Sequence, residues 1–167
     1  LHVTLPRRQA GNHQFFADGP ATAIETDLLG VPRQINTYQK SSNYYLIDAS
    51  RSMFKSTQST LPDSPVGVIW TIDAKNKSPE NSDFQAAHLT SFNNSWNNPK
   101  AVSAHYHGAK AFEYFNNTFN RNSINGKGGN IISLINVVED DGSQMDNAFW
   151  NGAAMFYGNG NQAFNAP

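Results

Sequence analysis

The amino-acid sequence predicts an α+β fold, a β-rich lobe with one long helix at about residues 99–119. Two apolar segments rich in β-branched residues predict strands: VGVIWTID at 66–73 and IISLINVV at 131–138. One stretch has the spacing of an amphipathic helix, and it begins after Asn98. Strands grouped around a single helix favour α+β over a regular alternation of strands and helices.

The chain of 167 residues is long enough for one domain, or for a domain with an extension. Residues 1–29 contain several glycines and prolines and little periodicity, so we expect an N-terminal extension or propeptide remnant, with room for a first strand at its end. We assign residues 30–167 to the lobe itself. Within it, β-branched and aromatic residues in the stretch 34–48 flank the turn-forming KSSN at 40–43, which predicts a hairpin.

The next part of the chain alternates between loop and strand. Residues 51–65 contain serine, threonine and proline and predict a loop before the strand at 66–73. Residues 74–98 are mostly polar and are expected to cross the surface. Three aromatic residues in this polar stretch, Phe84, Phe92 and Trp96, are expected to attach it to the core.

The helix has a clear start signal. Asparagine at the N-cap accepts a hydrogen bond from an unpaired backbone N–H, and proline fits the first helical position, so Asn98-Pro99 predicts a helix beginning there. Gly108 in its middle costs about 1 kcal/mol relative to alanine, which indicates close approach of another element. His105 and His107 are two residues apart and therefore point to different sides of the helix, one to the core and one to the surface.

After the helix, NGKGGN at 125–130 predicts a turn before the strand at 131–138. Short strands are expected around turns at Asn151-Gly152 and at residues 158–160. The acidic stretch Glu139-Asp140-Asp141 offers oxygen ligands for calcium, but it lacks the alternating spacing of a dedicated calcium loop. A solvated loop at the end of the strand is the preferred interpretation.

Composition excludes several functional classes. A net charge of −1 and a pI near 6.6 provide no basic surface for nucleic acid. No apolar run approaches the length of a membrane span. The absence of cysteine removes disulfides, thiolate metal sites and cysteine nucleophiles. Low charge and many amide side chains fit a secreted, extracellular bacterial protein from which any signal peptide has been removed.

The segment DNAFWNG at 146–152 combines amides and large aromatic residues before an Asn-Gly turn. Such a segment can hold an extended peptide by strand addition, with backbone groups and an apolar wall on one edge. The residues alone leave a second interpretation open, in which Phe149 and Trp150 are simply part of the core.

Two segments resemble a known family. VSAHYHGAKAFEYFNNTFNRNSIN at 102–125 and MDNAFWNGAAMFYGNGNQAF at 145–164 resemble the N-terminal half of the catalytic domain of thermolysin-like zinc metalloendopeptidases, of the thermolysin and vibriolysin type. INTYQKSSNYYLIDASRSMF and GVIWTIDAK, further upstream, are similar to the first strands of that domain. The resemblance covers about residues 30–166. It implies a β-rich N-terminal lobe that faces a helical C-terminal lobe across the active site.

The resemblance also implies where the metal chemistry lies. The family binds zinc through two histidines of an HExxH helix and a later glutamate, and the glutamate of the motif is the general base. The sequence contains no HExxH motif, so we expect the chain to end just before the zinc helix and to hold neither catalytic nor metal-binding residues. The implied partners are a C-terminal half that carries HExxH, a peptide or protein substrate, and the propeptide of a zymogen. Calcium is also expected in the whole enzyme.

Substrate-binding residues follow from the same resemblance. Asn147 matches an asparagine whose side chain bonds the substrate backbone, and Ala148 matches a residue whose carbonyl does the same. Phe149 and Trp150 match the aromatic edge strand along which the peptide lies, and Phe164 matches an aromatic residue of a primed-side pocket. We therefore expect the substrate-edge lobe of a secreted zinc endopeptidase that cleaves next to apolar residues. The alternative is a non-catalytic module, derived from that lobe, that binds peptides or another peptidase.

Overall fold

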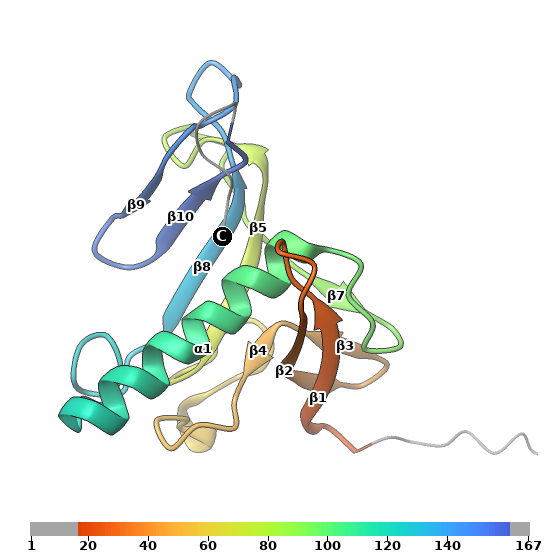
Figure 1. Ribbon diagram of the computed structural model, residues 1–167, viewed down its shortest axis with the longest axis vertical. Coiled ribbons are helices and arrows are strands. Elements are labelled where there is room, and N and C mark those ends of the chain that lie inside the picture. Colours follow the sequence, from red (N-terminus) through yellow and green to blue (C-terminus); the bar gives the residue numbers. More distant parts are fainter. Residues whose placement is uncertain (1–16, 161–167) are drawn as a thin grey trace, which may run out of the picture.

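The structure, a computed structural model, describes residues 17–160 and has two β-sheets joined by one long helix (Figure 1). This confirms the predicted α+β class. The elements are β1 (Gly19–Thr26), β2 (Pro32–Lys40), β3 (Asn43–Tyr45), β4 (Ile47–Asp48), the 3-10 turn η1 (Ser56–Gln58), β5 (Ile69–Lys77), β6 (Ala87–His88), β7 (Thr90–Ser91), α1 (Pro99–Phe119), β8 (Ile131–Val137), β9 (Ala148–Trp150) and β10 (Met155–Gly158).

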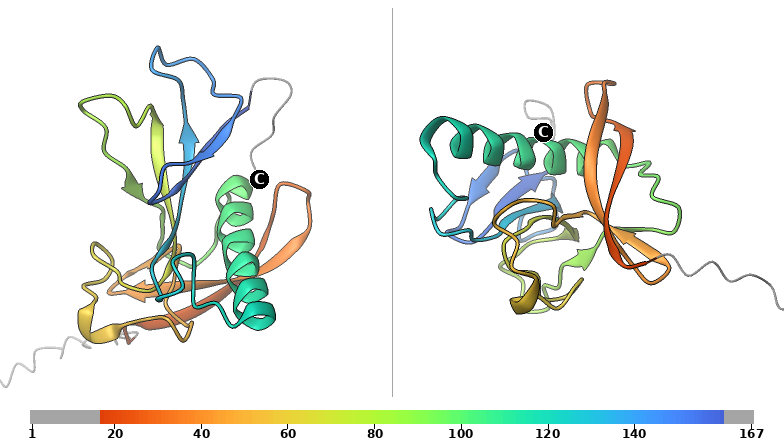
Figure 2. Two further views of the ribbon diagram at one scale, coloured as in Figure 1. Left: turned by 90° about the vertical axis from the view of Figure 1, so that its left-hand side faces the viewer. Right: turned by 90° about the horizontal axis from the view of Figure 1, so that it is seen from below.

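The first sheet is antiparallel, in the order β1-β2-β3-β7, and the second has the order β4-β5-β8-β10-β9, with β6 paired to β5. The chain passes from one sheet to the other at Leu46, the residue between β3 and β4, which is 1% exposed. Figure 2 shows α1 alongside both sheets, with β9 and β10 at the far end of the second sheet from β4. The predicted hairpin across residues 40–43 is present as the β2–β3 pair.

β1 forms a regular hairpin with β2, in register from Gly19 opposite Gln39 to Thr26 opposite Pro32. The boundary predicted between residues 29 and 30 therefore falls in the turn of this hairpin. Residues 19–26, at the end of the predicted extension, lie in the first sheet. The remainder of that extension, residues 1–16, lies outside the described residues.

α1 spans the predicted residues, Pro99 to Phe119. The side chain of Asn98 accepts a hydrogen bond from the backbone N–H of Ala101 at 3.1 Å, as an N-cap residue should. At the other end Asn120 adopts the left-handed conformation, with φ of 50°, and its N–H bonds the carbonyl of Phe115. Both ends of the helix are thus closed by asparagine.

Replacing Asn98 with alanine is expected to lower the free energy of unfolding by about 1 kcal/mol, because the first turn loses its side-chain acceptor. Urea denaturation followed by circular dichroism measures the change. Asn97→Ala is the matched control, since Asn97 is exposed and lies one residue before the cap. Equal stability of the two variants would contradict the capping role.

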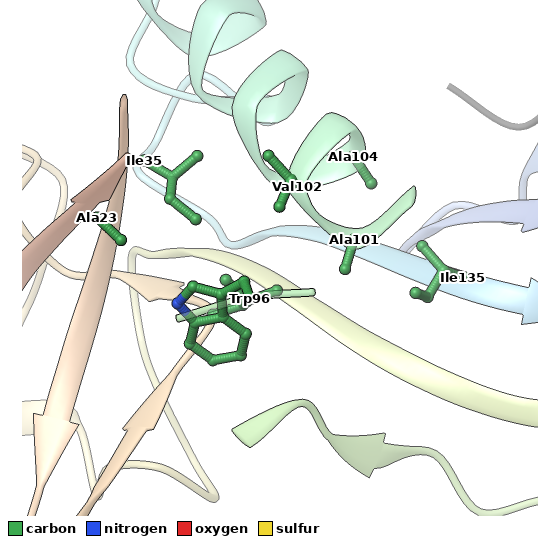
Figure 3. Close-up of a cluster of buried hydrophobic side chains, with 8 residues drawn as sticks. Ala23, Ile35, Trp96, Ala101, Val102, Ala104 and Ile135 are labelled. Atoms are coloured by element: carbon green, nitrogen blue, oxygen red, sulfur yellow. The ribbon is translucent and has the colours of Figure 1, made fainter. Parts of the chain in front are cut away.

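The main core lies where α1 meets the two sheets. Trp96, Val102 and Ile35 converge there from the loop, the helix and the first sheet (Figure 3). Trp96 is 5% exposed, and Phe84 packs against the buried cluster on the other side of the second sheet, as expected for residues that attach the polar stretch 74–98 to the core. The same expectation is wrong for Phe92, which is 81% exposed, because the following turn at Asn94 (φ 59°) directs the chain inward only at Trp96.

β5 and β8 are parallel neighbours, with Ile69 opposite Ile131, and α1 is the connection between them. The structure therefore contains one β-α-β crossover within an α+β fold. Gly108 lies where α1 crosses these strands: a Cβ there would be 3.2 Å from Cγ2 of Ile69 and 3.7 Å from Cγ2 of Ile131. The expected close approach at Gly108 is confirmed.

The two helical histidines separate as predicted. His105 is 1% exposed, whereas His107 is exposed and, among the described residues, bonds only the carbonyl of Ser103, four residues earlier. Nδ1 of His105 lies 2.9 Å from Oγ1 of Thr71, and its Nε2 lies 2.7 Å from the carbonyl oxygen of Asn36. Since Thr71 belongs to β5 and Asn36 to β2, one imidazole joins the helix to both sheets.

Candidate substrate-binding edge

β9 is the last strand of the second sheet. It pairs with β10 on one side, with Trp150 opposite Met155 and Ala148 opposite Tyr157, and with no described strand on its other side. An unpaired strand edge offers N–H and C=O groups at regular spacing, which is the arrangement that an added peptide strand requires.

The register determines which backbone groups face outward. In an antiparallel ladder, pairs that exchange hydrogen bonds alternate with pairs that do not. The N–H of Asn151 bonds the carbonyl of Ala154, and the N–H of Gly158 bonds the carbonyl of Asn147, so these two pairs are of the bonded kind. The residues next to them along β9, Ala148 and Trp150, therefore direct their N–H and C=O groups toward the free edge.

Asn147 lies at the beginning of this edge and is exposed. Its carbonyl is used within the sheet, but its side chain is on the outer side, where Oδ1 accepts the N–H of Ala148 at 2.8 Å. The amide NH2 of Asn147 donates no hydrogen bond to any described residue. The structure thus brings the side-chain amide of Asn147 and the carbonyl of Ala148 to one edge, and their roles toward a peptide remain predictions.

The two aromatic residues of β9 face opposite sides of the sheet. Phe149 stacks on Phe156, with ring centroids 4.9 Å apart and planes at 3°, and packs against the buried cluster behind the sheet. Trp150 is 41% exposed and lies on the other face with Met155. The Phe149 side chain therefore supports the edge from the core, whereas Trp150 is the aromatic residue available beside it. Phe164 lies outside the described residues.

The turn after β9 holds the edge in place. Oδ1 of Asn151 accepts the N–H groups of Ala153 and Ala154 at 2.9 and 3.0 Å, and Gly152 has a φ of 97°. The asparagine side chain bonds the backbone of the turn, and glycine adopts a positive φ without steric strain, which explains the Asn-Gly pair. The predicted turn at Asn151-Gly152 is confirmed.

A groove of about 450 Å³ lies on the Trp150 face of the sheet, between α1, β8 and β10. Most of its wall is apolar, and Met155, the cross-strand neighbour of Trp150, is one of the residues that line it. Tyr157 also lines the groove, and burial raises the pKa of its hydroxyl. The lining residues are His107, Gly108, Ala111, Phe112, Phe115, Arg121, Ser123, Ile124, Ile131, Ser133, Met155 and Tyr157.

Sequence reasoning assigned no role to this groove. A signal was present: His107, Ala111 and Phe115 recur at intervals of four, which aligns them along one side of a helix. These three helix residues do not form a recognisable apolar pattern, because they are a histidine, a small residue and an aromatic residue. The other wall of the groove comes from strands that follow the helix in the sequence.

The described residues do not fit a metal site. Residues 17–160 contain no group of three or more histidine, aspartate or glutamate side chains placed to hold an ion. In the acidic stretch 139–141, Asp140 accepts a hydrogen bond from the Ser78 hydroxyl, and hydrogen bonds from Ser143 lower the pKa of Asp141. This stretch closes a loop after β8. Over the same residues, no helix has both the length and the apolar character needed to cross a membrane.

Comparison with known proteins finds relatives among bacterial metallopeptidases. The family model of the thermolysin metallopeptidase catalytic domain matches residues 22–167. A bacillolysin of Bacillus cereus is 37% identical over 133 residues, which are 80% of this chain and 20% of that protein. Neutral protease NprE of Bacillus pumilus is 31% identical over 148 residues, 88% of this chain and 44% of that protein.

Among solved structures, the precursor of protealysin, a metalloproteinase from Serratia proteamaculans, aligns with a TM-score of 0.44 and 21% identity over 64% of this chain and 30% of that one. The chain spans between about a fifth and under a half of the length of these curated relatives. With the family model matched over most of its length, the chain belongs to the thermolysin family of metallopeptidases.

Proposed function

We propose that this chain is the substrate-binding lobe of a zinc-dependent endopeptidase, active when a C-terminal half carrying the HExxH motif is docked. The observation that carries the proposal is the edge of β9 that no strand within residues 17–160 covers, with the outward backbone groups of Ala148 and Trp150 beside an apolar groove. A peptide added to this edge gains main-chain hydrogen bonds, and its apolar side chains meet Trp150 and the groove. Cleavage next to apolar residues fits these surroundings.

The face around the groove supports docking of a second half. Phe115, Phe119 and Ile124 are 47%, 60% and 40% exposed, and the rings of Phe115 and Phe119 are 5.9 Å apart. A contiguous apolar surface of this kind is typical of an interface, because leaving it in water is unfavourable. The partner chemistry that fits is therefore an amphipathic helix with an apolar side toward the groove.

The metal belongs to the partner half in this proposal. Since residues 17–160 offer no ligand set, zinc would be held by the HExxH half, and calcium elsewhere in the whole enzyme. The lobe would bind and orient the peptide. We also propose secretion, in keeping with the low charge of the chain, and synthesis with a propeptide, which the resemblance to the thermolysin family implies.

Mixing this chain with a separately produced HExxH half and zinc is expected to yield peptidase activity that a chelator removes. In this complex, Asn147→Ala should lower kcat/KM by about 10- to 100-fold, because the substrate backbone loses hydrogen bonds worth roughly 1.5–3 kcal/mol in the transition state. Asn97→Ala is the control, an exposed asparagine outside the edge.

The result also separates the alternative function. If the reconstituted complex retains zinc and binds a peptide through β9 but cleaves nothing, a non-catalytic binding module is the better description. If Asn147→Ala and Asn97→Ala behave alike in an active complex, the assignment of the edge is wrong.

A further inference from the structure

A second pocket lies on the opposite side of α1 from the apolar groove. It has a volume of about 420 Å³ and is formed by β2, by Arg51 and by the helix side that carries Tyr106, Lys110 and Glu113. These helix positions point roughly half a turn away from those of the groove at 100° per residue. The two sites share no residue. The lining residues of the second pocket are Pro32, Arg33, Gln34, Asn36, Arg51, Tyr106, Lys110 and Glu113.

The charged part of this wall is mainly cationic. Arg33, Arg51 and Lys110 line the pocket, and Glu113 is the one carboxylate among its lining residues. Glu113 pairs with both Arg51, at 2.8 Å, and Lys110, at 2.6 Å, and so lies between these two cations. Two of the cations lie against the ring of Tyr106: the Arg33 guanidinium is 4.7 Å and the Lys110 ammonium 5.4 Å from its centroid. Three positive groups facing one cavity repel each other unless negative charge is placed among them or behind them.

Two buried carboxylates hold the arginines from behind. Asp27, which is 2% exposed, accepts Nε of Arg33 at 2.6 Å, and Asp48, which is 1% exposed, accepts Nε of Arg51 at 2.7 Å. Neither aspartate lines the pocket. The side chains of Arg33 and Arg51 are only 25% and 19% exposed, so both guanidinium groups are fixed and partly removed from water before any ligand arrives.

The fixed arginines keep unused donors. Arg33 donates through Nε and, to the Tyr106 hydroxyl at 3.5 Å, through Nη1. Arg51 donates through Nε and, to Glu113 at 2.8 Å, through Nη1. The Nη2 groups of both, and the exposed side-chain amide of Gln34, form no hydrogen bond with the described part of the chain. A guanidinium pairs best with planar carboxylate oxygens, which it can bond in parallel.

We propose that this pocket binds a small polycarboxylate through Arg33, Arg51 and Lys110. Its volume falls within the range of small-molecule sites and exceeds what one carboxylate fills, which favours a ligand with two or three such groups. Because the arginine geometry is already set by Asp27 and Asp48, binding requires little ordering of the protein. The site is independent of the proposed peptidase function.

Titration calorimetry of the metal-free chain with sodium citrate tests the site, with sodium chloride at equal ionic strength as the reference and inorganic phosphate as a second probe. Citrate is expected to bind saturably at one site, more tightly than phosphate, and more weakly as salt is added. In ¹⁵N spectra, the Nε–H signals of Arg33 and Arg51 should shift along with the calorimetric saturation, whereas that of Arg121 should not.

Lys110→Gln is expected to weaken citrate binding about fivefold, in line with one partly exposed ion pair. Arg33→Gln should weaken it at least about tenfold, since a charge-assisted hydrogen bond is lost. Lys127→Gln removes the same charge as Lys110→Gln from an exposed turn and should leave binding unchanged. Lys110→Gln provides the decisive comparison if Arg33→Gln fails to fold.

The proposal is overturned if citrate binds no more tightly than chloride at equal ionic strength, or if Lys110→Gln and Lys127→Gln have the same affinity. Phosphate binding as tight as citrate binding would also overturn it, because a site selected for several carboxylates would then be absent. In each case the charged network would serve only to fasten α1 to the first sheet.

Discussion

Replacing Gly158 with alanine is expected to destabilise the chain by about 3 kcal/mol, the upper range for overpacking of a tight site. A Cβ at this position would lie 2.2 Å from the carbonyl oxygen of Met145 and 2.8 Å from its carbonyl carbon. Both are backbone atoms, so no side-chain rotation can relieve the contact. The midpoint of urea denaturation, with the slope held in common, measures the loss.

Gly158→Ala should also change the geometry of the candidate substrate-binding edge. The N–H of Gly158 bonds the carbonyl of Asn147, and the carbonyl at which the clash occurs accepts the N–H of Gly160. If the added methyl group moves Gly158 away from Met145 and Asn147, the β9 edge changes its position relative to β10. In the reconstituted complex we expect Gly158→Ala to raise KM for peptides even at temperatures where the variant is fully folded.

Gly19→Ala is the control for this experiment. Gly19 also lies in a strand, but a Cβ there would have no neighbour within 4 Å. Its substitution should change stability by less than about 0.5 kcal/mol, as is usual at open surface positions. A Gly158→Ala variant as stable as Gly19→Ala would show that the Met145 segment can shift freely and that its contact with Gly158 does not fix the β9 edge.

The parts of the fold that sequence reasoning located correctly have local chemical causes. The bounds of α1 follow from Asn98 and Pro99, whose capping preferences act within one turn and do not depend on the rest of the chain. The turn at Asn151-Gly152 likewise follows from the side chain of Asn151 and the φ of Gly152. Such signals are contained in two or three neighbouring residues.

The parts that were missed depend on contacts between distant residues. A first strand was expected at the end of the extension, and β1 is there, but its pairing with β2 could not be predicted: the large apolar residue Ile24 is 72% exposed and the small Ala23 is buried, so the strand shows no apolar face in its sequence. The parallel pairing of β5 and β8 joins segments about 60 residues apart, from Ile69 to Ile131, and neither segment encodes its neighbour. The resemblance to a family indicated the segments of β5 and β8 but not their pairing.

The candidate site shows the same division. The sequence pattern of residues 146–152 indicated a strand edge, and the structure has an edge strand there. It left open whether Phe149 and Trp150 belong to the core or to a binding surface, and the answer differs for the two: Phe149 stacks on Phe156, and Trp150 is exposed. Alternation along a strand makes this split natural, but which of the two faces inward is set by the register with β10.

The imidazole of His105 is expected to make stability depend on pH. Burial lowers the pKa of His105 from its ordinary value of 6.5, an effect larger than the opposing influences of the Asn36 carbonyl and the Asp48 carboxylate. The folded chain therefore holds this histidine neutral at pH values where the unfolded chain has already taken up a proton. Where the unfolded state binds more protons, stability decreases as the pH falls.

The contribution of His105 to the free energy of unfolding should thus be constant above about pH 6.5 and decrease below it. The slope should approach about 1.4 kcal/mol per pH unit, the limit for one proton. Asp48 contributes in a separate, more acidic window. Burial raises the pKa of this carboxyl, but hydrogen bonds from Ser50, Arg51 and Asn36 outweigh burial and bring it below 3.8, so its contribution is lost only at lower pH.

Urea denaturation at a series of pH values between 8 and 5 measures the slope, and His105→Gln should abolish most of it while retaining a polar group between Thr71 and Asn36. His107→Gln is the control, because His107 is exposed and its ring bonds the carbonyl of Ser103 on its own helix. If His107→Gln removed the slope and His105→Gln did not, the acid sensitivity would arise at the surface. Loss of the slope with His105→Gln alone would show that the contact joining α1 to both sheets is also the site at which acid opens the fold.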